Sequence, residues 1–319
     1  MQRRKKFPLP KSLKENVVYF LFKLFTIWVK RVPLISLGSY GEAIGTIAFH
    51  TIGKARKIAL NNLRLALGSE KNEQEIERIC RSAFKNIARD MMEVSHFPQY
   101  EESYLRSLLR LEGSEYLDQA LERGKGVVAI SAHLGNFTLM AIRLAKEGYP
   151  LSIVTKYSKN PKIVKFITSY ADSVGIESIP DKPRMACVAQ SLKALKENRI
   201  LMIHIDLNAP TTEAWVDFFG YLVPTYKGPV VLSSRTGAPI LPIFTVRNAD
   251  QYHHVMIYPP LDLDVTENRE RDIHTNTAKI TKTVEAMIMK YPEQWWWIHP
   301  RFKRARDIQT GKRLAPKHF

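Results

Sequence analysis

Short apolar runs alternate with helical patterns through the middle of this 319-residue chain, and this alternation constrains the fold most. Apolar runs predict strands at 126–132, 151–155, 200–206, 239–246 and 253–258. Periodic patterns predict helices at 137–148, 161–175, 184–198 and 271–291. Strands that alternate with helices form sheets covered by helices. The sequence therefore predicts an α/β fold with a mixed, mostly parallel central sheet flanked by helices.

The first 100 residues differ from this middle part and are expected to be all-helical. Residues 71–94 carry apolar side chains with the i, i+3, i+4 spacing of an amphipathic helix. The apolar run Val17–Val29 is interrupted by Lys23 and is shorter than the roughly 20 residues that a membrane-spanning helix needs. Phe, Trp and Leu flanked by lysines favour a helix that lies in a membrane interface. A true span and an ordinary core helix remain alternatives.

The formal net charge of +17 calls for an anionic partner. Basic residues concentrate at both ends, beside apolar and Trp-rich segments, and there is no nucleic-acid-binding motif. We therefore expect an anionic membrane surface as a partner, and no nucleic acid. Cys80 and Cys187 give neither a disulfide framework nor zinc-ligand spacing, which favours a reduced, cytosol-facing protein. No cofactor-binding or metal-binding motif is found, so we expect neither.

These patterns divide the chain into three parts. Residues 1–53 form a basic, apolar region expected to associate with a membrane, and residues 54–306 form the α/β domain. Residues 307–319 form a basic tail.

His133 and Asp206 each follow a predicted strand. The carboxyl ends of parallel strands meet at one edge of a sheet, where active sites of such folds lie. His133 and Asp206 are therefore candidate active-site residues. Each residue has a structural alternative, because a histidine or an aspartate can simply cap the loop that follows its strand.

Four blocks in order resemble the bacterial lipid A biosynthesis (lauroyl/myristoyl) acyltransferase family, which includes phosphatidylinositol mannoside acyltransferases. They are SAHLGNF (131–137), DLNAPTTEAWVDFFG (206–220), GPVVLSSRTGAPILP (228–242) and PEQWWWIHPRFK (292–303). ARKIALNNLRLALG (55–68) resembles the N-terminal region of that family. The resemblance extends from about residue 35 to residue 306. The Pro-Glu-Gly-Thr block of glycerolipid acyltransferases is missing, which favours the glycolipid branch.

The resemblance implies transfer of a fatty acyl group from an acyl carrier protein or coenzyme A thioester to a hydroxyl of a membrane glycolipid, such as a lipid A precursor. It implies a place on the cytoplasmic face of the bacterial inner membrane. The family motif is His, four residues, then Glu or Asp, with the histidine as general base. His133 matches, but Thr138 stands in the carboxylate position. Either Asp206 or Glu213 replaces that carboxylate, or the chain is a repurposed lipid-binding homologue without catalysis.

Further residues are assigned roles through the resemblance, each with a structural alternative. The turn at Gly135 and Asn136 is a candidate oxyanion hole or merely a tight turn. Phe218, Phe219 and Gly220 are expected to line an acyl chamber or to belong to the core.

The remaining candidates concern the acceptor and the membrane. Lys156 and Tyr157 match a position near the acceptor head group. Arg235 is a candidate phosphate ligand, or a surface arginine that covers a helix, and Arg301 is a candidate substrate-binding residue. The run Trp295–Trp297 suits either a membrane interface or a buried strut.

Overall fold

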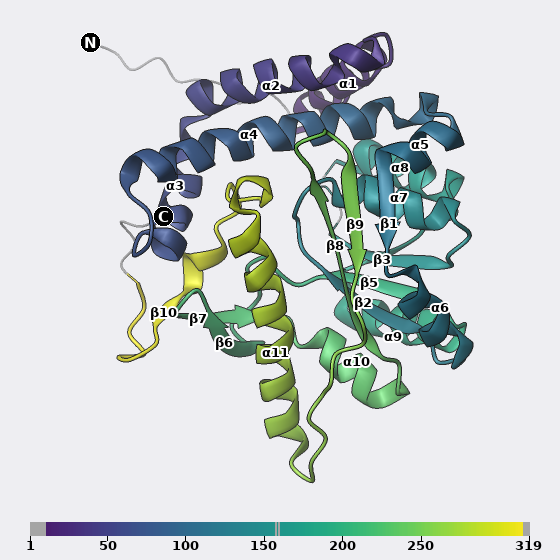
Figure 1. The fold of residues 1–319 in the computed structure, drawn as a ribbon, viewed down its shortest axis with the longest axis vertical. Coiled ribbons are helices and arrows are strands. Elements are labelled where there is room, and N and C mark those ends of the chain that lie inside the picture. The colour runs from purple at the N-terminus through teal and green to yellow at the C-terminus, as the bar shows by residue number, and fades with distance from the viewer. Residues whose placement is uncertain (1–10, 157, 159, 315–319) are drawn as a thin grey trace.

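A mixed seven-stranded sheet forms the centre of the protein. The computed structural model describes residues 11–156, 158 and 160–314 (Figure 1). Across these residues the strands follow the order β1-β9-β8-β2-β5-β3-β4. Their bounds are β1 Leu109–Glu112, β2 Val127–Ser131, β3 Leu151–Thr155, β4 Glu177–Pro180, β5 Ile200–His204, β8 Ile240–Arg247 and β9 His253–Ile257. Strands β8, β2, β5, β3 and β4 are parallel, whereas β9 runs antiparallel to β8 and pairs in parallel with β1. The predicted mixed, mostly parallel sheet is confirmed.

Helices cover both faces of this sheet. They are α5 Glu102–Leu108, α6 Ser114–Glu122, α7 Phe137–Lys146, α8 Pro161–Ser173, α9 Arg184–Lys196, α10 Gly228–Thr236 and α11 Arg269–Lys290. Alternate residues of β2 enter opposite cores because side chains alternate along a strand. Val128 and Ile130 pack in the core that contains α9, α10 and α11 residues, and Val127 and Ala129 pack in the core that contains α5, α6 and α7 residues.

The N-terminal third is helical, as predicted, and lies along one end of the sheet (Figure 1). It contains α1 Lys11–Val29, α2 Leu34–Thr51, α3 Gly53–Leu67, α4 Glu73–His96 and the short 3-10 helix η1 Phe97–Gln99. Helix α4 crosses the carboxyl end of β8, where it meets Arg247. Among the described residues, no helix is both long and apolar enough to cross a bilayer.

A small antiparallel sheet lies beside the main one and was not predicted. It pairs β6 Ala214–Phe218 with β7 Tyr221–Thr225, and β7 with β10 Arg306–Asp307. The 3-10 helices η2 Pro292–Gln294 and η3 Arg301–Arg304 lead the C-terminal segment back to this sheet. The edge strands β1 and β4 were also missed, because four-residue strands of mixed polarity carry little periodic signal.

Helices α2 and α4 approach each other through glycines of α2. A Cβ atom added at Gly45 would lie 2.5 Å from the Cα atom of Lys85, and one added at Gly41 would lie 2.7 Å from the Cα atom of Arg89. Both contacts are with backbone, which cannot swing aside. Glycine is therefore required at these two positions for α2 to pack against α4.

We predict that Gly45→Ala destabilises the protein by about 1–3 kcal/mol because the added methyl group forces α2 away from α4. Gly53→Ala is the matched control, since a Cβ at Gly53 meets nothing within 4 Å. Alanine favours a helix over glycine by about 1 kcal/mol, so the control should be neutral or slightly stabilising. Urea unfolding of both variants measures the difference, and equal stability would contradict this account of the helix pair.

Candidate active site

His133 and Asp206 form a hydrogen-bonded pair at the carboxyl edge of the sheet. His133 follows β2, Asp206 follows β5, and these two strands are adjacent and parallel. The Nδ1 atom of His133 lies 2.9 Å from Oδ1 of Asp206. The backbone N–H of His133 donates to Oδ2 of the same carboxylate at 2.8 Å. Both the ring and the main chain of His133 are thus fixed to Asp206.

Asp206 is buried, although it lies in the loop just after β5. Its exposed fraction is 1%. Trp295 donates its indole N–H to Oδ2 at 2.7 Å, so the carboxylate accepts from three donors. Burial raises the pKa of Asp206, but His133 nearby and the hydrogen bonds from His133 and Trp295 outweigh it and hold this pKa well below its usual range. Asp206 is therefore an anion at neutral pH.

The Nε2 atom of His133 makes no hydrogen bond to any residue within the described ranges. Its side chain is 16% exposed, so part of the ring reaches solvent. An imidazole that donates from Nδ1 to a carboxylate carries its lone pair on Nε2. The arrangement can accept a proton at Nε2, and the developing charge would be balanced by Asp206.

Three rings surround the His133 imidazole. Phe137 and His204 each lie 4.8 Å from it between ring centroids, and Trp296 lies 5.2 Å away. Burial lowers the pKa of His204 to about 3 and that of His299 to about 4, with further lowering from His133 nearby. Both histidines are neutral at pH 7. The site therefore has an apolar wall around one base and one buried anion.

The turn after His133 is clamped by the C-terminal segment. Gly135 donates its N–H to the carbonyl of Gln294 at 3.0 Å, and Trp296 donates to the carbonyl of His133 at 3.2 Å. Gly135 has φ +54°, and a Cβ there would lie 2.4 Å from the carbonyl oxygen of Thr245. The oxyanion role predicted for Gly135 is wrong, because its N–H is already engaged. This glycine makes a tight turn against β8.

Asn136 also has a structural role. Its side chain accepts from the N–H of Leu139, which caps α7, and donates to Oε2 of Glu93 at 2.9 Å. Asn136 is 1% exposed. The side chain thus points toward α4. The oxyanion prediction for Asn136 concerned its backbone N–H, and it stays a prediction.

Glu93 belongs to a buried ionic cluster that joins α4 to β8 and β9. Arg247 donates to Glu93 and Asp90, at 2.5 Å and 2.7 Å, and His253 lies 2.8 Å from Glu93. Asp90, Glu93 and His253 have the donor types of a metal site. The guanidinium of Arg247 already supplies the cation between the two carboxylates. We therefore assign this cluster to packing of α4 on the sheet.

Thr138 does not replace the motif carboxylate. It lies in the first turn of α7, and within the described part of the chain it makes no hydrogen bond to the His133 ring. Glu213, the other candidate carboxylate, is buried and paired with Arg184 at 2.5 Å. Asp206 is the carboxylate that contacts His133.

The predicted acceptor residues lie at different places. Lys156 follows β3 at the carboxyl edge and is close enough to His299 to lower its pKa. Tyr157 lies outside the described residues. Arg235 is exposed in the last turn of α10, before β8 begins, and so lies at the opposite edge from His133. The phosphate role predicted for Arg235 at this site is therefore wrong.

Arg301 is a strut. It is fully buried, and it donates to the carbonyls of Leu207 and Pro224 and to the hydroxyl of Thr225. Burial lowers the pKa of Arg301 to about 10. Because these contacts are internal, the expected substrate contact is wrong, and Arg301 instead fixes the loop after Asp206.

The aromatic candidates divide between core and site. Phe218 is fully buried and packs against Trp295 and Phe302, and Phe219 and Gly220 form the turn between β6 and β7. These are core and turn positions, so the structural alternative to an acyl chamber describes them. Trp295 and Trp297 are also fully buried, which makes them struts and not membrane contacts.

His204 and Trp296 were missed by sequence reasoning as parts of this wall. His204 lies in the predicted strand 200–206, and Trp296 lies in the block 292–303. The sequence signal for His204 was its place near the end of the predicted strand that leads to Asp206, and in the structure it pairs with Ser131, two residues before His133. Trp296 carried no local signal that separates it from Trp295 and Trp297.

The family model described as bacterial lipid A biosynthesis acyltransferase matches residues 4–304. The phosphatidylinositol mannoside acyltransferase of Mycolicibacterium smegmatis is 24% identical over 241 residues, covering 74% of this chain and 76% of that protein. The lipid A biosynthesis palmitoleoyltransferase of Escherichia coli is 24% identical over 289 residues, covering 90% and 91%. The E. coli lipid A biosynthesis lauroyltransferase is 23% identical over 286 residues, covering 87% and 89%.

We predict that the buried histidines make the protein acid-sensitive. An unfolded histidine titrates near pH 6.5, whereas the folded pKa values of His204 and His299 are about 3 and about 4. The unfolded chain therefore binds more protons below pH 6.5, and the unfolding free energy falls as the pH drops toward 4.

His204→Phe should reduce this slope by up to about 1.4 kcal/mol per pH unit, the value for one proton. Urea unfolding measures the slope of the unfolding free energy against pH. It is carried out between pH 7.5 and pH 4.5 in steps of roughly one unit, across the window that these pKa values set. The two proteins should have equal slopes above pH 7. Equal slopes below pH 6 would contradict the burial of His204 as a neutral ring.

Proposed function

The chain belongs to the bacterial lipid A biosynthesis acyltransferase family, and we propose that it transfers a fatty acyl group from an acyl carrier protein or coenzyme A thioester to a hydroxyl of a membrane glycolipid, such as a lipid A precursor. Its family makes it an acyltransferase that uses an acyl donor and a glycolipid acceptor. The net charge of +17 suits both proposed donors, which are anionic.

In the proposed reaction, Nε2 of His133 removes the proton of the acceptor hydroxyl while the hydroxyl oxygen attacks the thioester carbonyl carbon. A tetrahedral oxyanion forms and collapses, which breaks the carbon–sulfur bond. The proton on Nε2 then passes to the leaving thiolate, so the histidine is regenerated. Asp206 holds the ring orientation and balances the imidazolium charge, as the aspartate of a serine triad does.

The contact between His133 and Asp206 carries this proposal. The family motif expects a carboxylate at 138, and Thr138 brings no charge. Asp206 brings a carboxylate to Nδ1 from the adjacent strand instead, at 2.9 Å. The repurposed, non-catalytic alternative rested on the missing charge, and this contact supplies a charge.

We predict that Asp206→Asn lowers turnover by about 10²-fold or more, because the amide neither fixes the tautomer nor balances the imidazolium. The same change should destabilise the fold by about 1–3 kcal/mol, since buried donors lose an acceptor. Turnover is therefore normalised to the folded fraction. The assay uses lauroyl thioesters of acyl carrier protein and of coenzyme A, with a lipid A precursor as acceptor.

Glu213→Gln is the matched control, because Glu213 is also a buried carboxylate but pairs with Arg184. It should retain turnover per folded molecule. If Asp206→Asn is as active as this control, Asp206 is structural. If the unmodified protein binds lipid but turns over neither thioester, the lipid-binding alternative applies.

We also propose that α1 attaches the protein to the cytoplasmic face of the bacterial inner membrane. Phe22 packs edge-on against Phe166, and Val29 is fully buried, so one side of α1 faces the protein. Large apolar side chains lie exposed at helical spacing on the other side, with fractions of 40% to 60%: Val17, Phe20, Leu21, Leu24, Ile27 and Trp28. We call these six residues the apolar stripe. An exposed stripe of this kind suits an interfacial helix.

Replacing Leu21 and Leu24 by glutamine should lower binding to vesicles about tenfold or more, since each buried leucine contributes roughly 1.5–3 kcal/mol. Vesicle flotation measures the bound fraction. Met185→Gln with Val265→Gln is the control, because these two side chains are the same kind of exposed apolar group outside the stripe. Equal binding of the two double variants would exclude the stripe as the anchor.

A further inference from the structure

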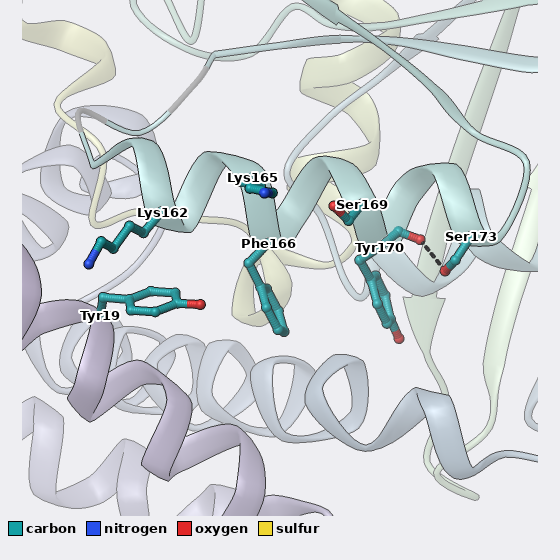
Figure 2. A pocket seen from close by; sticks show the side chains of 7 residues that line it. All are labelled: Tyr19, Lys162, Lys165, Phe166, Ser169, Tyr170 and Ser173. Carbon is teal, nitrogen blue, oxygen red and sulfur yellow. Dashed lines mark hydrogen bonds between the residues drawn. The ribbon is translucent and has the colours of Figure 1, made fainter.

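A groove of about 580 Å³ lies between α1 and α8. Its lining residues are Tyr19 from α1 and Lys162, Lys165, Phe166, Ser169, Tyr170 and Ser173 from α8. Figure 2 shows the rings of Tyr19, Phe166 and Tyr170 in a row on one side of α8. The rings of Phe166 and Tyr170 are stacked, with centroids 6.5 Å apart. The groove therefore has an apolar floor that does not belong to the site around His133.

Positive charge surrounds this groove. Lys162 and Lys165 line it, and none of the other described lining residues is a carboxylate. The Nζ atoms of Lys162 and Lys23 both lie 5.8 Å from the Tyr19 ring centroid, so two cations approach one ring from two helices. Lys162 also donates to Asn16 at 2.9 Å. An aromatic floor with ammonium groups above it fits a phosphate attached to apolar material.

The groove lies on a flank of α1. Residues four apart in a helix share a face, so Tyr19 and Lys23 lie together beside α8. The apolar stripe occupies the exposed side of the helix next to this flank. When the stripe enters the acyl boundary of a membrane, lysines on the flank are held at the depth of the lipid phosphates.

We propose that the groove between α1 and α8 binds the phosphate-bearing head group of an anionic phospholipid of the surrounding bilayer. The proposal rests on the attachment of α1 to a membrane. Charge complementarity and the depth of the groove beside the stripe favour a bilayer lipid as occupant.

This site has a consequence for the orientation of the enzyme. Asn160 caps α8 by accepting from the N–H of Lys162, and it donates to the carbonyl of Glu15 in α1 at 2.7 Å. Helix α8 follows β3, whose carboxyl end lies at the same sheet edge as His133. A lipid held between α1 and α8 therefore fixes the edge that carries His133 relative to the bilayer.

The test uses the full chain and two kinds of vesicle, phosphatidylcholine alone and phosphatidylcholine mixed with phosphatidylglycerol. Lys162→Gln with Lys165→Gln should lower partitioning onto the mixed vesicles by about fivefold per lysine at low salt, and should not change partitioning onto the neutral vesicles. Lys193→Gln with Lys196→Gln is the control. These exposed lysines have the same i, i+3 spacing on α9, which lies away from α1 (Figure 1).

Equal losses in the two double variants would mean that total charge acts and would overturn the groove as a site. A raised KM for the glycolipid acceptor in detergent, with vesicle binding unchanged, would assign the groove to the acceptor and also overturn the proposal. Inorganic phosphate alone, without vesicles, could also protect Lys162 and Lys165 from chemical acetylation. That result would assign the groove to free phosphate and would overturn the proposal.

The apolar stripe variant separates this proposal from the attachment on which it rests. In one outcome, the Leu21 and Leu24 variant loses binding to both vesicle types while the Lys162 and Lys165 variant shows no selective loss. This result would reject the groove as a lipid site and support the attachment of α1. If neither variant changes vesicle binding, both the groove and the attachment of α1 are rejected.

Discussion

The site depends on one buried carboxylate. Asp206 accepts hydrogen bonds from the ring and main chain of His133 and from the indole of Trp295. These three residues come from the ends of two adjacent strands and from the C-terminal segment. An anion with 1% exposure persists only when its lone pairs are used in this way. The carboxylate therefore joins three distant parts of the chain, and it orients the base because it is itself held.

The remainder of the structure keeps those parts in place. Arg301 fixes the loop after Asp206 through internal hydrogen bonds, and Gln294 holds the turn after His133. The ionic cluster around Arg247 packs α4 onto the sheet and reaches Asn136 in that same turn. Arg301 and Gly135, which were expected to contact substrate, thus hold the site in place through internal hydrogen bonds. In our account the N-terminal helices also set the distance of this edge from the membrane.

The sequence predicted the parts of the fold that carry a strong periodic signal. The parallel strands, their helices and the helical N-terminal region were confirmed because each repeats apolar residues over several turns or strand positions. His133 and Asp206 were placed together in advance because strand ends of parallel strands share an edge. The β6–β7 hairpin and the roles of Arg301 and Trp296 were not predicted, whereas the tight-turn alternative for Gly135 describes the structure. The partners of Arg301 and Trp296 are more than 50 residues away in the chain, and only tertiary packing brings them together.

The central claim is that His133 and Asp206 act as one catalytic unit, and a double-mutant cycle on turnover tests it most directly. His133→Ala, Asp206→Asn and the combined variant are assayed for acyl transfer per folded molecule. If the aspartate acts only through the histidine, the combined variant should be about as slow as His133→Ala alone. Losses that multiply in the combined variant would show that the two residues act independently, and would contradict the account.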